Sequence, residues 1–131
     1  MNLTLWIATG LLAVAALSGG ISKTFVSLDK LAAINNGKGG AWVADASRGF
    51  VRTLGILEIL AAVGLILPPL VDVAPVMVPV TAVCWVLLMV GAITIHVRYR
   101  DGAKFVALTS FYLAMAAFIA WGRFGAESFP A

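Results

Sequence analysis

Glu58 is the residue whose type and position say most about chemistry in this chain. It is the only acidic residue in a predominantly apolar run from 49 to 67, and it lies at the midpoint of that run. If the run crosses a membrane as a helix, a charge at this depth costs at least about 2.5 to 3.5 kcal/mol. A carboxyl group kept there can exchange protons or contact a ligand, or it can simply tie helices together through a hydrogen bond.

The side chains expected at the depth of Glu58 carry no positive charge. Aligning the midpoints of the apolar runs brings Tyr112, Cys84 and the indole of Trp85 to this depth. Without a cation, the charged form of a buried carboxyl group is disfavoured. We therefore expect Glu58 to be protonated and to donate its O–H to one of these neighbours.

Two cations precede Glu58 in the sequence, and neither is expected to pair with it. Arg52 is six residues earlier, about 240° around a helix, so the two side chains lie on different faces. Lys23 closes the first apolar run, and its stem could reach inward, but its backbone is expected to lie too near the membrane surface for a firm pair with Glu58 unless the two helices are offset.

Cys84 and His96 are each the only residue of their type. One thiol excludes an internal disulfide, a CxxC pair and a cysteine metal cage, and one histidine excludes a bis-histidine haem within one chain. We expect no metal site and no covalently bound cofactor. His96 could relay a proton at the end of its helix, although a histidine that simply closes a helix is the more common case.

The composition excludes a water-soluble domain. Of the 131 residues, 62% are hydrophobic and 11% are charged, against about 45 to 50% and 25% in soluble domains. The sequence predicts an all-α, integral membrane, up-and-down four-helix bundle as one domain, with spans at 3–22, 49–67, 75–97 and 105–121. Segment 23–48 is expected to lie along the membrane surface, with a flexible Asn and Gly run at 35–40. A short amphipathic helix is expected to start at Ser27, with Leu28, Leu31, Ala32 and Ile34 on its apolar face. Asp45 and Ser47 are the capping candidates for the start of the second span.

The nine Lys and Arg residues alternate in phase with the four spans. Five flank or lie in the first loop, three lie in the third loop, and one, Arg123, lies in the tail. This pattern predicts cytoplasmic first and third loops and both termini outside. Membrane topology thereby accounts for the net charge of +3. The positive charge therefore does not indicate nucleic acid as a partner.

Small residues recur four apart on the first span, where Ala16 precedes Gly20, and Gly55 lies on the second span. Such positions let two helix backbones approach closely in lipid. We expect them to serve packing within the bundle rather than a seam between two copies.

Several segments together resemble the DoxX-like family of small four-helix membrane proteins. They are Lys23 after Ser18-Gly19-Gly20, the run Arg52-Thr53-Leu54-Gly55-Ile56-Leu57-Glu58, Gly64 to Pro68, Ala74-Pro75, Ala92 to Arg98, and Trp121 to Phe124. The resemblance implies a bundle in a bacterial cytoplasmic (inner) membrane, with Lys23, Arg52, Glu58 and His96 as the polar positions of interest. It also implies a link to quinol oxidation and membrane redox complexes, although the chain has no evident means of transferring electrons itself.

Four functions remain open from the sequence. The first is an accessory or ligand-binding subunit for a lipophilic molecule such as a quinone, with Glu58 as its polar contact. The second is a proton-coupled small-molecule exporter, and the third is a membrane isomerase that uses proton transfer. The fourth is an assembly factor. Expected partners are the lipid bilayer, a membrane redox complex or further copies of the chain, and no residue is assigned a catalytic role.

Overall fold

The computed structural model describes residues 1–33 and 39–129. Four long helices dominate it: α1 (Asn2–Phe25), α4 (Arg48–Leu70), α5 (Met77–Arg98) and α6 (Ala103–Phe124). Each is long and apolar enough to cross a membrane. Two short helices, α2 (Leu28–Ala33) and α3 (Trp42–Asp45), lie between α1 and α4. Within the described residues no strand occurs, so the expected all-α bundle of a multi-pass membrane protein is confirmed.

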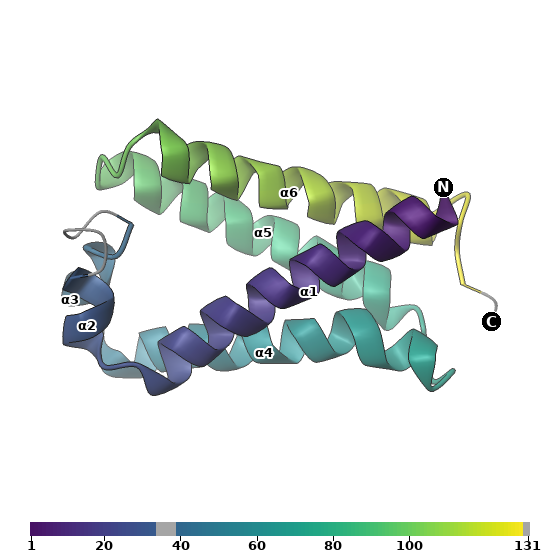
Figure 1. The fold of residues 1–131 in the computed structure, drawn as a ribbon, viewed down its shortest axis with the longest axis horizontal. Coiled ribbons are helices and arrows are strands. Elements are labelled where there is room, and N and C mark those ends of the chain that lie inside the picture. The colour runs from purple at the N-terminus through teal and green to yellow at the C-terminus, as the bar shows by residue number, and fades with distance from the viewer. Residues whose placement is uncertain (34–38, 130–131) are drawn as a thin grey trace.

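The four long helices form two antiparallel pairs, α1 with α4 and α5 with α6 (Figure 1). The pairs meet near the end that carries both termini, where a Cβ atom on Gly122 of α6 would lie 2.7 Å from a methyl group of Leu5 on α1. They diverge toward the opposite end, which α2 and α3 cover (Figure 1). This divergence leaves space inside one half of the bundle.

The outer faces of all four helices are apolar. Leu3, Leu60, Leu87 and Phe111 expose 72, 59, 68 and 56% of their surface, respectively. Large apolar side chains at this exposure on all four helices suit contact with lipid. The bundle is therefore apolar on the outside as well as in its core.

Most helix ends extend slightly beyond the expected spans, but α5 starts at Met77, two residues after the expected start at Pro75. The second span was expected to stop at 67, but α4 continues through Pro68 and Pro69 to Leu70. Proline already has a helical φ angle and lacks only the N–H, so it can lengthen the last turn by leaving carbonyl groups one turn earlier unpaired. The N-terminal end of α4 follows the sequence more closely, because the Ser47 hydroxyl accepts the Phe50 N–H.

The surface segment folds partly as expected. Helix α2 follows Ser27, whose hydroxyl accepts the Lys30 N–H, and its buried Leu31 packs with Val43 of α3 and Val51 of α4. Residue Ile34, which was expected to continue the apolar face of this helix, and the part of the Asn and Gly run at 35–38 lie outside the described residues.

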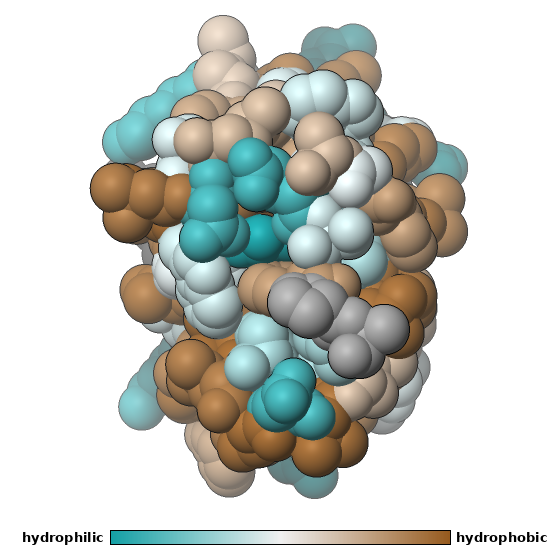
Figure 2. All heavy atoms as spheres, turned by 90° about the vertical axis from the view of Figure 1, so that its right-hand side faces the viewer, coloured by the Kyte–Doolittle hydropathy of each residue, from teal (hydrophilic) through white to brown (hydrophobic). Residues whose placement is uncertain are grey.

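Both termini lie at one end of the bundle, as four spans require. Figure 2 looks onto this end and shows hydrophilic side chains gathered between hydrophobic ones. Arg123 is only 4% exposed here and donates to the Asn2 side chain at 2.8 Å and to the Glu127 carbonyl at 2.9 Å. It thus joins the start of α1 to the C-terminal segment. That this end faces outside the cell stays a prediction from the charge pattern.

Candidate functional site

Helices α1 and α4 touch backbone to backbone at two glycines. A Cβ atom on Gly20 would lie 2.7 Å from the Gly55 carbonyl oxygen, and one on Gly55 would lie 2.8 Å from the Gly20 carbonyl oxygen. No side chain larger than hydrogen fits at either position without moving a helix. The close approach expected from the small residues is confirmed, and it fixes how far α1 is shifted along α4.

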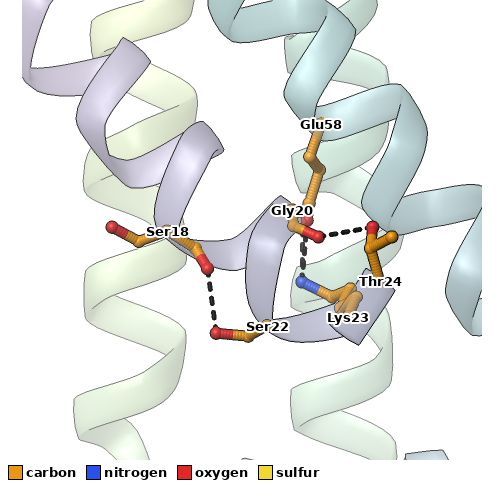
Figure 3. Close-up of polar contacts among 6 residues, drawn as sticks. All are labelled: Ser18, Gly20, Ser22, Lys23, Thr24 and Glu58. Carbon is orange, nitrogen blue, oxygen red and sulfur yellow. Dashed lines mark hydrogen bonds and ion pairs between the residues drawn. The ribbon is translucent and has the colours of Figure 1, made fainter. Parts of the chain in front are cut away.

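This contact brings Lys23 to Glu58. The Lys23 Nζ atom lies 3.1 Å from Glu58 Oε1 and 3.0 Å from Oε2, and the pair is the polar centre of Figure 3. The side chains of Lys23 and Glu58 are 23 and 8% exposed. Both atoms of the pair lie against Gly19, where a Cβ atom would be 3.2 Å from Glu58 Oε2 and 3.4 Å from the ammonium nitrogen.

The expectation that Lys23 lies too far from Glu58 is therefore wrong. It rested on aligning the midpoints of the spans, whereas the glycine contact places the last turn of α1 beside the second turn of α4. Helical side chains lean toward the N-terminus, so the Lys23 stem runs back into the bundle. Glu58 accepts hydrogen bonds from the Lys23 ammonium group, so the expectation that no cation lies near Glu58 is wrong too.

The partners expected at mid-membrane do not bond to Glu58. Cys84 is exposed. Trp85 is buried, but its indole N–H has no hydrogen-bond partner among the described residues. Tyr112 is half-buried and packs beside Phe111, with ring centres 6.2 Å apart. Aligning the midpoints of the spans therefore predicted the depth of these side chains, but not which side chains contact Glu58.

A cavity of about 930 Å³ occupies the space between the diverging helix pairs. The Lys23–Glu58 pair lies in its wall, together with His96 and Tyr112, so four of the six candidate residues share one cavity. Cys84 and Arg52 do not line it. Most of the remaining wall is apolar and aromatic, with Trp42, Phe50, Trp85, Phe105, Phe111 and Met115 among its members.

The cavity is open sideways to the lipid-facing surface. Leu11 and Val14 of α1 and Phe111 of α6 line it while exposing 55, 65 and 56% of their surface. On the other side, Phe50 of α4 and Leu87 of α5 line it at 51 and 68% exposure. The cavity therefore reaches the apolar outer surface at residues of α1 and α6 and at residues of α4 and α5.

His96 forms a second polar group in the wall, held by a residue that sequence reasoning missed. Its Nδ1 atom lies 2.7 Å from Asp101 Oδ2, and its ring stacks on Phe105 with centres 5.6 Å apart. Asp101 is 3% exposed. This bond fixes the imidazole and leaves Nε2 as the ring nitrogen for other contacts. The sequence offered one signal for this contact: Asp101 follows His96 by five residues, so a short loop can bring its carboxyl group back to the ring.

The α2–α3 segment closes the wide end of the cavity. Leu31, Gly40, Trp42 and Val43 contribute to the lining. The segment is fastened to α5 by the Tyr99 hydroxyl, which donates to Asp45 Oδ2 at 2.7 Å. This hydrogen bond, to an acceptor that carries negative charge, raises the pKa of Tyr99 above its usual value, so the fastening persists at physiological pH.

The arrangement of the wall suits the binding of a small apolar molecule that has a polar end. Within the described residues, no group of three or more His, Cys, Asp or Glu side chains is placed to hold a metal ion. The cavity instead offers an apolar interior with two fixed polar groups, the Lys23–Glu58 pair on one helix pair and His96 on the other. Such walls orient an apolar molecule by its polar end.

Comparison with known proteins gives one match. Residues 7–119 match the family model described as the DoxX-like family, which covers all four spanning helices apart from a few terminal residues. No curated protein and no solved structure matches the chain significantly.

Proposed function

The chain belongs to the DoxX-like family, and we propose that it is an accessory membrane protein that binds a lipophilic molecule, such as a quinone, in the cavity between its helix pairs. The observation that carries this proposal is the buried Lys23–Glu58 pair in the wall of an apolar cavity of about 930 Å³. Cavities that bind small molecules usually measure about 300 to 1,000 Å³ and combine apolar walls with a few fixed polar groups.

The charges of the wall favour a neutral polar head on the ligand. Lys23 and Glu58 neutralise each other, and His96 is already held by Asp101. A phosphate or carboxylate would have to compete with Glu58 for the one ammonium group, in a wall that is largely apolar. Carbonyl and hydroxyl groups can instead bond to the pair without separating its charges.

Trp85 supports a head group that carries an acceptor oxygen. The residue lines the cavity, is 4% exposed, and keeps an indole N–H without a partner in the described structure. A buried donor left unpaired costs about 1 to 3 kcal/mol. A ligand carbonyl oxygen would remove that cost, and a quinone presents two such oxygens.

The side openings support a ligand that stays partly in the bilayer. A head group between Glu58 and His96 leaves room for a long apolar tail to leave between α1 and α6 or between α4 and α5. Such a protein would present or shelter a quinone for a membrane redox complex rather than reduce it. The family resemblance and the charge pattern support a location in a bacterial inner membrane, and we propose that the cavity lies in its cytoplasmic half.

Tryptophan fluorescence tests this proposal. Trp42 and Trp85 line the cavity, whereas Trp6 and Trp121 do not. Titration of the purified protein with a short-chain quinone is expected to quench part of the emission saturably. Glu58→Gln is expected to weaken the apparent affinity about tenfold, the effect of losing about 1.4 kcal/mol of binding. Quenching that is linear in quinone and equal in both proteins would reject the proposal.

A further inference from the structure

A second hollow lies on the other side of Lys23, where α1 ends and α4 begins. It has a volume of about 240 Å³ and is lined by Arg48 and Arg52 of α4, and by residues 23 to 28. The two arginines are four residues apart, so they lie on one face of the helix. The hydroxyl groups of Thr24 and Ser27 belong to the same lining.

The charge of this hollow is positive and uncompensated. In the part of the chain that the structure describes, no acidic residue lines it. The Lys23 ammonium group is already paired with Glu58, so Arg48 and Arg52 supply the free charge. Among the described residues neither arginine forms an ion pair, and both are exposed. Arg52 is a candidate site residue that does not line the main cavity. It lines this second hollow instead.

Apolar side chains also line the hollow, at the level expected for a membrane surface. Phe25 and Val26 line it and expose 76 and 37% of their surface. Phe25 ends one apolar span and Arg48 begins the next, so the hollow lies where lipid head groups meet acyl chains. Guanidinium groups beside hydroxyl groups suit a phosphate oxygen, and exposed apolar side chains suit the chains beneath it.

We propose that this hollow binds the phosphate of an anionic phospholipid, with Arg48 and Arg52 as the phosphate contacts and Phe25 against an acyl chain. The site is separate from the main cavity and does not depend on the ligand proposed there. It would fasten the α1–α4 corner to the membrane surface beside the segment that closes the cavity.

Native mass spectrometry of the full chain in detergent tests the site. Phosphatidylglycerol and phosphatidylcholine with identical chains are titrated into wild type, into Arg48→Gln/Arg52→Gln, and into Arg98→Gln/Lys104→Gln. The last variant removes two exposed charges from the same end of the bundle, outside the hollow. Arg48→Lys/Arg52→Lys keeps the charge and serves as a folding control.

Wild type is expected to bind phosphatidylglycerol more tightly than phosphatidylcholine. Loss of both hollow arginines is expected to weaken phosphatidylglycerol binding about 25-fold, about fivefold for each charge. The lysine pair is expected to retain most of the binding, and the control pair less than about a twofold loss. Equal losses in the two glutamine pairs, or no preference between the lipids in wild type, would overturn the site. Full displacement of the lipid by equimolar inorganic phosphate would reject a phospholipid as its ligand.

Discussion

Lys23→Met is expected to destabilise the protein by about 3 to 5 kcal/mol, the usual effect of removing one partner of a buried ion pair. If Lys23 and Glu58 formed an ordinary exposed ion pair, the loss of stability would be far smaller, because exposed pairs contribute under about 1 kcal/mol. Exposures of 23% for Lys23 and 8% for Glu58 place this pair nearer the buried case. Methionine keeps the length of the stem, so the loss reports the missing ammonium group beside an apolar wall.

A double-mutant cycle with Glu58→Gln separates the pair from other effects. The double variant has no unpaired charge in the wall and is expected to be more stable than Lys23→Met alone. Unfolding by denaturant in mixed micelles, followed by helical circular dichroism, gives the four free energies. If Lys23→Met stays within about 0.5 kcal/mol of wild type, the ion pair does not hold α1 to α4.

Gly20→Ala is expected to be nearly as damaging, although it adds one methyl group. The new Cβ atom would lie 2.7 Å from the Gly55 carbonyl oxygen and 2.9 Å from the Ile59 backbone nitrogen. Because these atoms belong to the backbone of α4, the helices must separate, and overpacking of this kind costs about 1 to 3 kcal/mol. Separation of the helices also draws Lys23 away from Glu58. The quenching of tryptophan fluorescence by quinone is therefore expected to weaken along with the stability of this variant.

Gly10→Ala is the matched control on the same helix. A Cβ atom there would meet nothing within 4 Å, and alanine is favoured over glycine inside a helix by about 1 kcal/mol. We expect Gly10→Ala to be as stable as wild type or more so. Equal behaviour of the two variants would contradict the close contact between α1 and α4.

The sequence was sufficient for the features that depend on one segment at a time. Hydrophobic runs predicted the four spans, Ser47 predicted the start of α4, and glycines on α1 and α4 predicted a close approach. Each of these follows from length, spacing or the size of one residue. The position of Glu58 near the middle of α4 could likewise be predicted from one segment alone.

The features that depend on how helices are offset and tilted could not be predicted. The shift of α1 along α4, which gives Glu58 its cation, is set by the fit of Gly20 against Gly55 in three dimensions. The cavity arises because the two helix pairs diverge, and no residue pattern encodes that angle. Asp101 was missed because a loop turns it back onto His96.

The most direct test of the ligand proposal is to identify the lipophilic molecules that co-purify with the protein, by mass spectrometry and absorption spectroscopy. Wild type is compared with Glu58→Gln and with Gly91→Phe, which adds a ring beside the cavity where a Cβ atom meets nothing within 4 Å. Gly10→Phe, at an equally open position outside the lining, is the control.

We expect one compound with a neutral polar head, such as a quinone, in wild type and in Gly10→Phe. Its amount is expected to fall about tenfold, equivalent to about 1.4 kcal/mol, in Glu58→Gln and in Gly91→Phe. The same bulk phospholipids and no specific compound in all four proteins would contradict the claim that the cavity is a ligand site.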